Sequence, residues 1–407
     1  MSDFHQSGVI TTLHRLGRCQ KQEAMEAKLI EYADRRPVAL VLPCLYSELD
    51  GPALKHIVEH LRHVGYLREI VVGLDRATKR QFQLARKFFS ALPQQVRILW
   101  RDGPRIQKLT SLLVKNDLSV GSPGKGSNIW MASGLVLADE RCKIIAVHDC
   151  DIVSYDNELL ARLVFPLASP SMDYEFCKGY YARVADRLYG RVTRLLVTPL
   201  IRALRKILGR DLPLLVFLDG FRYPLAGEFS MLTDLARANR IPADWGLEMG
   251  VLCEVFRNCT IKRVCQVELA DTYEHKHQPL SPDDQTKGLT KMSVDIVKSL
   301  FRNLATEGVV LSDAMFRTVT VRYLRAAQDA VKQYEDDAAL NGLPFDRHQE
   351  LRAVHAFNKA VRAAADEYLL DPLGIPLISN WNRVTSAIPD FYDRLREAVD
   401  ADNGGKS

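Results

Sequence analysis

Two aspartates separated by one residue follow a short apolar run, and this pair carries the clearest chemical signal in the chain. The run at residues 144–147 is Ile-Ile-Ala-Val, and Asp149 and Asp151 come just after it. Carboxylate oxygens at a strand end, together with substrate phosphate oxygens, are the ligands that Mg²⁺ or Mn²⁺ prefers. Asp is also common in turns after strands, so the pair alone leaves a metal site and an ordinary helix-capping loop equally open.

A glycine-rich segment with one lysine comes before a predicted helix. Residues 121–127 read GSPGKGS, with Lys125 between two glycines. Glycine lets the backbone approach an anion, and Lys125 would add positive charge at a helix N-terminus. The spacing is not that of a P-loop, because Gly126 rather than Ser or Thr follows the lysine. On its own, such a segment is more often a flexible turn that caps a helix.

A second candidate anion site lies at the sequence YGRVTR, residues 189–194. Gly190, Arg191 and Thr193 would offer backbone N–H groups, a guanidinium and a hydroxyl at a predicted helix start. These groups together suit a phosphate or carboxylate. The alternative is an ordinary helix N-terminus with surface arginines.

The sequence EHKH, residues 274–277, places two histidines two positions apart. On a strand, His275 and His277 would share one face. A neutral imidazole could then complete a metal site begun by carboxylates. An isolated pair of this kind is more often part of a solvated loop.

Alternating strand and helix patterns predict a sheet that would bring these segments together. Apolar runs predict strands at residues 38–42, 69–72, 96–100 and 143–147. Helical patterns lie between them, at residues 54–64, 78–92, 106–114 and 128–138. This order predicts a parallel, doubly wound sheet, in which ligands bind beyond the carboxyl ends of the strands. The pattern of residues 175–272 is mixed, as expected where a sheet gains antiparallel strands.

The chain is expected to divide into three regions. Residues 1–36 form an N-terminal helical extension, because residues 20–33 are rich in Glu, Lys, Ala and Leu. Residues 37–285 hold the α/β catalytic domain. Residues 286–407 are a helical C-terminal region that could form a homodimer or cover the site.

Composition and charge argue against several classes of protein. The 55 basic and 50 acidic residues leave a net charge of only +5, which does not indicate a nucleic-acid partner and fits anionic ligands. The apolar segments at residues 195–201 and 212–218 are far shorter than the roughly 18 residues that span a bilayer. We expect no signal peptide and no transmembrane segment. The eight cysteines form no C-x-x-C pair, which predicts free thiols in a reducing cytoplasm.

Taken in order, the motifs resemble those of glucosyl-3-phosphoglycerate synthases, a family of retaining glycosyltransferases. The resemblance covers about residues 37–290, and each motif is weak while the ordered set is specific. The motifs are Lys125 in G-K-G, the Asp149 and Asp151 pair, KGYY from Lys178, GRVT from Gly190, PLAGE from Pro224, WGLEMG from Trp245, and His275 four residues before Pro279.

The resemblance implies a fold and a reaction. The fold is an α/β, GT-A type, Rossmann-like mixed sheet flanked by helices. The reaction is transfer of a hexose, expected to be glucose, from a nucleoside diphosphate sugar to the 2-hydroxyl of 3-phosphoglycerate. It requires a divalent cation, Mg²⁺ or Mn²⁺, and leads toward glucosylglycerate, a compatible solute.

The resemblance also assigns a role to individual positions. The donor would contact Pro43, Leu45, Glu48, Asp75, Lys125 and Asp149. The acceptor would contact Gly190, Arg191, Thr193 and His277. Asp151 and His275 would bind the metal, and Asp151 and Glu248 are the catalytic candidates.

Departures from the family pattern keep other readings open. Residues 43–48 read PCLYSE where the family has a sequence like PALNEE, and His277 stands where the family has Asn. A related transferase that makes glucosylglycerate or a mannosyl product from another glycerate-like acceptor is therefore the main alternative. A sugar nucleotidyltransferase is less favoured, because residues 43–48 contain no glycine for a phosphate-binding loop. The retained Asp149, Asp151, Glu248 and His275 argue against a non-catalytic scaffold.

Overall fold

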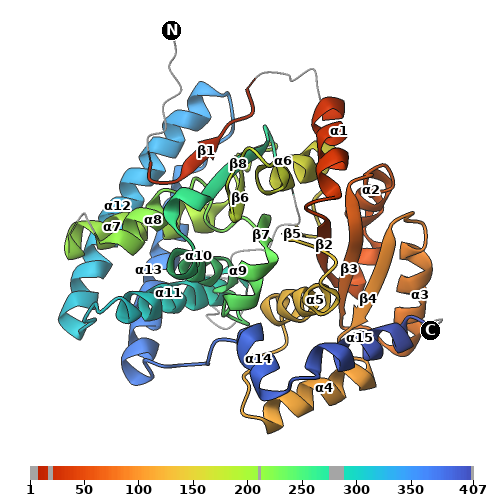
Figure 1. Ribbon diagram of the computed structural model, residues 1–407. Helices are drawn as coiled ribbons and strands as arrows, with labels where there is room; N and C mark the ends of the chain where they lie inside the picture. The colour runs from red at the N-terminus through yellow and green to blue at the C-terminus, as the bar shows by residue number, and fades with distance from the viewer. Residues whose placement is uncertain (1–7, 17–21, 210–211, 275–287, 405–407) are drawn as a thin grey trace.

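The computed structural model shows a mixed β-sheet with helices against both faces (Figure 1). The structure describes residues 8–16, 22–209, 212–274 and 288–404. Within these residues the sheet has eight strands, in the spatial order β1-β8-β6-β7-β5-β2-β3-β4. In chain order they are β1 (Thr11–Leu13), β2 (Val38–Leu45), β3 (Leu67–Asp75), β4 (Gln95–Trp100), β5 (Ile144–Val147), β6 (Phe176–Tyr181), β7 (Phe229–Leu232) and β8 (Val264–Ala270). Strand β7 runs antiparallel to β5 and β6, and all other neighbours are parallel.

The central strands are apolar throughout because both of their faces are buried. In β2, Ala39 and Val41 join one core, while Leu40 and Leu42 point to the opposite face and join a second. Alternate side chains of a strand point to opposite faces, so a strand covered on both sides needs an unbroken apolar run. This explains why the predicted strands stand out in the sequence as short apolar runs.

Two layers of helices enclose the sheet. The core on one face is completed by α1 (Gln22–Ala33), α2 (Pro52–Leu61), α3 (Lys79–Phe89) and α6 (Asn157–Ala168). The core on the other face is completed by α4 (Pro104–Lys115), α5 (Lys125–Asp139), α9 (Thr233–Ala238) and α10 (Leu247–Asn258). Short helical turns are η1 (Tyr46–Asp50), η2 (Val192–Val197), which is π-helical, and η3 (Ile261–Arg263).

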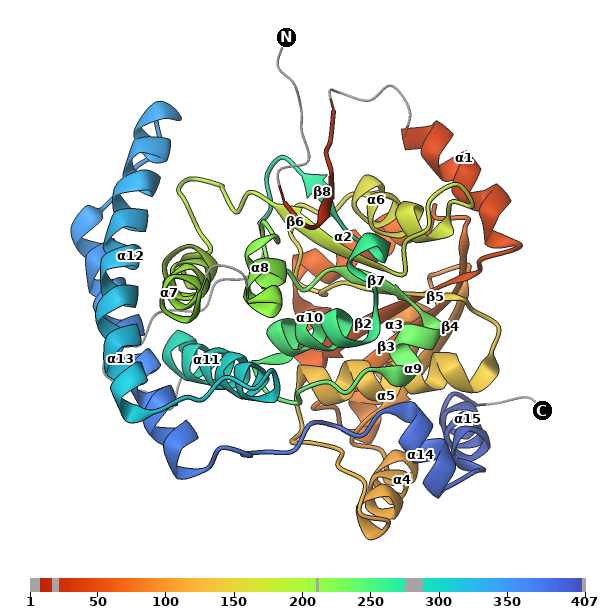
Figure 2. The same ribbon diagram turned by 60° about the vertical axis from the view of Figure 1, so that its left-hand side comes forward.

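A group of mostly C-terminal helices packs beside the sheet, as Figure 2 shows from the side. Its members are α7 (Thr198–Leu208), α8 (Pro213–Asp219), α11 (Gly288–Thr306), α12 (Asp313–Leu340) and α13 (Arg347–Leu370). Helix α12 packs on α7 and α13, and α11 packs on α10 and α13. The helical prediction for the segment after residue 286 is therefore confirmed, and its core is continuous with that of the sheet.

The end of the chain returns to the first half of the sheet through α14 (Trp381–Ala387) and α15 (Phe391–Asp402). The indole of Trp381 stacks on Trp130 of α5, with ring centroids 4.2 Å apart. The side-chain amide of Asn403 donates to the carbonyl of Ile98 at 2.8 Å and accepts from its N–H at 3.0 Å. Because β4 is the last strand of the sheet, this amide occupies backbone groups that a further strand would otherwise pair with.

The N-terminal segment differs from the expected helical extension. Helix α1 lies within the expected extension, but residues 11–13 form β1, which pairs in parallel with β8. Ile10 beside it is 1% exposed, so burial of this apolar residue draws the segment onto the sheet. The three-residue strand is too short to give a periodic pattern in the sequence. The division of the chain near residue 286 stays a prediction.

The structure also describes the cysteines and the character of the helices. All seven cysteines within the described residues are free and buried. None of the described helices combines the length and the apolar character needed to cross a membrane.

Candidate active site

One edge of the sheet gathers the polar residues that the sequence singled out. Parallel strands β2, β3, β5, β6 and β8 all end at this edge, and the antiparallel β7 begins there. Asp75 is the last residue of β3, and Asp149 follows β5 by two positions. Glu228 comes directly before β7. The strand-end rule therefore places these carboxylates together.

A lysine lies between two of the predicted site carboxylates. Lys125 Nζ is 2.7 Å from Asp149 Oδ1 and 3.1 Å from Glu248 Oε1. Lys125 is the first residue of α5, while Glu248 lies in the first turn of α10 and is 8% exposed. Three candidates that are far apart in the chain thus meet in one charge cluster.

This cluster keeps its lysine charged. Burial disfavours the ammonium, but the carboxylates of Asp149 and Glu248 outweigh that effect and raise the pKa of Lys125 above its usual value. Gly227 packs against the same group, since a Cβ there would lie 2.5 Å from Asp149 Oδ2 and 3.0 Å from Lys125 Nζ. Any larger residue at 227 would push this ion pair apart, which explains the glycine of the PLAGE motif.

A buried carboxylate beside the cluster carries no role in the sequence prediction. Glu228 is fully buried and accepts hydrogen bonds from the hydroxyls of Tyr181 at 2.8 Å and Tyr273 at 2.6 Å. Burial and then the charge of Asp149 raise the pKa of Glu228, whereas the Tyr273 hydroxyl and Lys125 oppose that rise. The PLAGE motif signalled Glu228, but no sequence signal pointed to Tyr273.

Lys178 is a second lysine near these carboxylates, and its environment differs from that of Lys125. It is fully buried and donates to the carbonyl of Ala226 at 2.5 Å. Burial lowers the pKa of Lys178 to about 8, although Glu248 and Glu228 act in the opposite direction. Its bond to Ala226 fixes the backbone that leads into Gly227 and Glu228, so Lys178 supports the site from beneath.

The predicted donor residues of the first two strands lie side by side. Leu45 is paired in register with Asp75 and is 38% exposed, while Pro43 and Glu48 are half-buried. Asn128 Nδ2 donates to Asp75 Oδ2 at 2.9 Å. An apolar exposed side chain next to a fixed carboxylate suits a nucleoside, which presents a flat base and ribose hydroxyls.

Asp75 is held in place by residues that the sequence did not single out. Asn128 also donates to the carbonyl of Gly73 at 2.7 Å, and Arg101 Nε lies 3.6 Å from Asp75 Oδ1. Burial raises the pKa of Asp75, while Arg101 and Asn128 favour its ionised form.

The predicted metal ligands are described only in part. Asp151 is half-buried, two residues beyond Asp149 at the end of β5. His275 lies outside the described residues. Among the residues that are described, no group of three or more His, Cys, Asp or Glu side chains is placed to hold a metal ion. Mg²⁺ and Mn²⁺ need only one or two protein carboxylates when substrate phosphates and waters complete the shell, and Asp151 fits that role.

Two residues just before Asp151, His148 and Cys150, are uncharged at neutral pH. Contact with the thiol of Cys44 and burial raise the pKa of Cys150 well above its usual value. Burial lowers the pKa of His148 to about 4, and its Nδ1 lies 2.9 Å from the carbonyl oxygen of Asp149. Cys150 and His148 therefore shape the strand end and leave the negative charge to the two aspartates.

Arg191, the predicted acceptor residue, is held by the C-terminal helices. Its Nε donates to Glu350 Oε1 at 2.6 Å, and its Nη2 donates to Gln349 Oε1 at 2.7 Å. Glu350 is 4% exposed, and its other oxygen accepts from Arg194 Nη2 at 3.0 Å. A single carboxylate of α13 thus orients two guanidinium groups, and no motif in the sequence pointed to it.

The neighbours of Arg191 in the GRVT motif fit an anion site. Gly190 has φ of +71°, a left-handed conformation that favours glycine. The buried hydroxyl of Thr193 has no hydrogen-bond partner among the described residues. A buried hydroxyl without a partner is costly, and a bound ligand would satisfy it. His277, the fourth predicted acceptor residue, lies outside the described residues.

Comparison with known proteins gives matches to named enzymes over nearly the whole chain. No protein-family model matches the chain. The chain is 48% identical over 403 residues to the glucosyl-3-phosphoglycerate synthase of Persephonella marina, covering 99% of each chain. It is 39% identical over 406 residues to the enzyme of the same name from Methanococcoides burtonii, covering 98% of each.

A solved structure confirms the fold class. The glucosyl-3-phosphoglycerate synthase of Mycobacterium tuberculosis, crystallised with Mn²⁺, UDP-glucose and phosphoglyceric acid, aligns with a TM-score of 0.53 and 22% identity. The alignment covers 73% of this chain and 88% of that chain. At this level of identity the likeness shows the GT-A fold that was expected from the sequence.

Proposed function

The chain belongs to the family of glucosyl-3-phosphoglycerate synthases, and we propose that it transfers glucose from a nucleoside diphosphate sugar to 3-phosphoglycerate. The observation that carries this proposal is the 48% identity to such a synthase over 99% of both chains. The clustering of Lys125, Asp149 and Glu248 at the carboxyl edge of the sheet supports it independently.

The donor would lie along the strand ends. Leu45 and Asp75 would contact the base and ribose, with Pro43 and Glu48 beside them. Asp149 would bind ribose or sugar hydroxyls, because a carboxylate held by Lys125 is a fixed acceptor. The positive charge of Lys125 would also stabilise the donor phosphates, which gain negative charge as the glycosidic bond breaks.

A divalent cation is part of the proposal. Asp151 and His275 would hold Mg²⁺ or Mn²⁺, which as a Lewis acid stabilises the leaving diphosphate. The solved relative from Mycobacterium tuberculosis was crystallised with Mn²⁺.

The acceptor would bind at the start of η2. The guanidinium of Arg191 and the unpartnered hydroxyl of Thr193 would contact the phosphate and carboxylate of 3-phosphoglycerate. Glu350 would keep Arg191 aimed at that group. Arginine suits this task because its planar fork binds such anions with two hydrogen bonds.

Transfer is proposed to retain the configuration at the sugar. The acceptor hydroxyl would attack from the face that the diphosphate leaves, and the departing phosphate oxygen would take the hydroxyl proton. Glu248, fixed by Lys125, would bind the transferred sugar and the acceptor hydroxyl. The chain would act in the cytoplasm, where its buried thiols stay reduced, and its product would serve as a compatible-solute precursor.

Product formation by the full-length protein tests the function. The expected activity needs Mn²⁺ or Mg²⁺, prefers a glucose donor to a mannose donor, and prefers 3-phosphoglycerate to glycerate. A panel of UDP-, GDP- and ADP-sugars identifies the base.

Asp151→Ala should nearly abolish turnover, whereas the exposed control Asp173→Ala should not. Full activity of Asp151→Ala in chelator would remove the metal assignment, and a preference for free glycerate would remove the acceptor assignment.

A further inference from the structure

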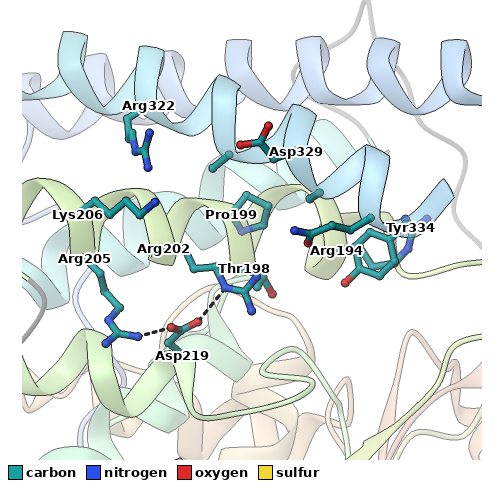
Figure 3. A pocket seen from close by; sticks show the side chains of 13 residues that line it. Arg194, Thr198, Pro199, Arg202, Arg205, Lys206, Asp219, Arg322, Asp329 and Tyr334 are labelled. Carbon is teal, nitrogen blue, oxygen red and sulfur yellow. Dashed lines mark hydrogen bonds and ion pairs between the residues drawn. The ribbon is translucent and has the colours of Figure 1, made fainter. Parts of the chain in front are cut away.

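A pocket of about 360 Å³ lies between η2, α7, α8 and α12, among the helices beside the sheet (Figure 3). Its walls carry five cationic side chains and two carboxylates. The cations are Arg194, Arg202, Arg205, Lys206 and Arg322, and the carboxylates are Asp219 and Asp329. Arg191 does not line it, so this pocket differs from the proposed acceptor site.

The two carboxylates of the pocket already have partners. Asp219 forms ion pairs with Arg205 and, at 3.4 Å, with Arg202. Asp329 lies 3.3 Å from Arg325, which points to solvent on the same helix. Neither carboxylate therefore neutralises the cations on the opposite wall.

Two of the remaining cations, Lys206 and Arg322, have no such compensation. Within the described part of the chain, neither Lys206 nor Arg322 forms an ion pair, and the buried Nε of Arg322 has no hydrogen-bond partner. Figure 3 shows Arg322 reaching from α12 toward Lys206 on α7. Two like charges that share a partly enclosed space repel each other unless an anion lies between them.

Arg194 supplies a buried donor at the other end of the pocket. It is 8% exposed, and its Nη1 has no hydrogen-bond partner, although Nε and Nη2 are bonded to Tyr189 and Glu350. Its guanidinium lies 4.7 Å from the ring centroid of Tyr334 on α12, a cation–π contact that helps to fix its position. Arg194 lines the pocket, so its guanidinium borders the space that an anion would occupy.

We propose that this pocket binds a small phosphate-bearing anion through Arg194, Lys206 and Arg322. A pocket of this volume admits a small molecule. Two guanidinium groups and an ammonium match the oxygens and the double charge of a phosphate better than those of a single carboxylate. The inference goes beyond the proposed function, since binding here involves neither the donor nor the acceptor residues.

Calorimetric titration of the full-length protein with inorganic phosphate tests the site. Lys206→Gln and the double variant Lys206→Gln/Arg322→Gln should weaken phosphate binding by at least about tenfold, as expected for lost charge-assisted contacts. Arg317→Gln is the matched control, because Arg317 is an exposed arginine of α12 outside the pocket. A second arm with 3-phosphoglycerate distinguishes the free ion from a phosphate ester.

The Arg191→Ala background separates this pocket from the acceptor site. Phosphate binding that persists in Arg191→Ala and is lost in Lys206→Gln supports the proposal, whatever the enzyme's reaction. Unchanged binding in the double variant overturns it, as does an equal loss in Arg317→Gln. A loss in Arg191→Ala as deep as in the pocket variants also overturns it, because there would then be one anion site. Thermal unfolding verifies that each variant is folded, and Lys206→Gln changes only an exposed side chain.

Discussion

The donor end and the acceptor end of the proposed site are built in different ways. At the donor end, Asp75 and Asp149 stand at strand ends, and Lys125 begins a helix that packs on those strands. At the acceptor end, Arg191 takes its orientation from Glu350, which lies 159 residues later in the chain. One half of the site thus follows from the sheet, whereas the other half depends on how a separate group of helices docks.

This difference predicts how each end responds to substitution. The donor cluster pairs its charges within the sheet edge, because Lys125 contacts both Asp149 and Glu248 directly. The acceptor arginine is balanced by a carboxylate that need not touch any substrate. Substitutions at the donor end should therefore lower the rate of the reaction itself. Substitutions that remove the support of Arg191 should weaken acceptor binding alone.

Among the variants that test this comparison, Lys125→Met should have the largest effect. Losing this charge leaves Asp149 and Glu248 facing each other and removes a cation near the departing phosphates, so kcat/KM should fall about 100- to 1,000-fold. Steady-state kinetics measure it. Lys143→Met is the control, because Lys143 is exposed at the other end of β5. A fall of less than about threefold would show that the donor cluster is only structural.

Arg191→Ala should come next. Loss of a charge-assisted contact raises the acceptor KM about 10- to 150-fold, with much less change in donor affinity. Arg191→Lys should recover only part of the loss, since an ammonium lacks the planar fork. The opposite result, weaker donor binding with unchanged acceptor kinetics, would assign η2 to the donor end. The two ends of the site would then not differ in the way described above.

Glu350→Gln tests whether the acceptor end depends on the C-terminal helices. The glutamine amide keeps the shape of the side chain but loses its charge. The strength of each hydrogen bond to Arg191 and Arg194 should therefore fall by about half, and the acceptor KM should rise roughly fivefold. The donor KM should stay within about twofold, and Glu350→Asp should be the milder variant. Glu335→Gln is the control, since Glu335 pairs with Arg347 near the same helix start. Equal changes in both KM values would indicate general loss of structure.

The smallest effect is expected from Cys150→Ser. The pKa of this thiol is raised by its contact with Cys44 and by burial, so it stays protonated and is a poor nucleophile or metal ligand. We expect kcat within about threefold of the unmodified enzyme, because a serine hydroxyl can keep a hydrogen bond at that position. A loss as deep as that of Lys125→Met would place thiol chemistry at the donor end.

The same contrast decides what could be predicted from the sequence. Asp149 and Asp151 follow an apolar run, so the strand-end rule located them without knowledge of packing. Glu350 lies in a helix whose pattern shows only an apolar face and a polar face, and its partners depend on side chains that meet across the fold. Strand β1 and Tyr273 were not predicted for a similar reason. A strand of three residues and a single aromatic residue are both too short to show a repeating hydrophobic pattern in the sequence.

The amide of Asn403 has a consequence for the order in which the chain folds. The strand that it covers, β4, ends at residue 100, whereas Asn403 lies close to the C-terminus. During synthesis the N-terminal strands would leave the ribosome long before the residue that covers their outer edge, and that edge would stay open to other chains in the interval. Contacts between such distant residues also form slowly. We therefore expect a chain that lacks its last helix to aggregate during expression, and the fraction that stays in solution to keep its catalytic rate.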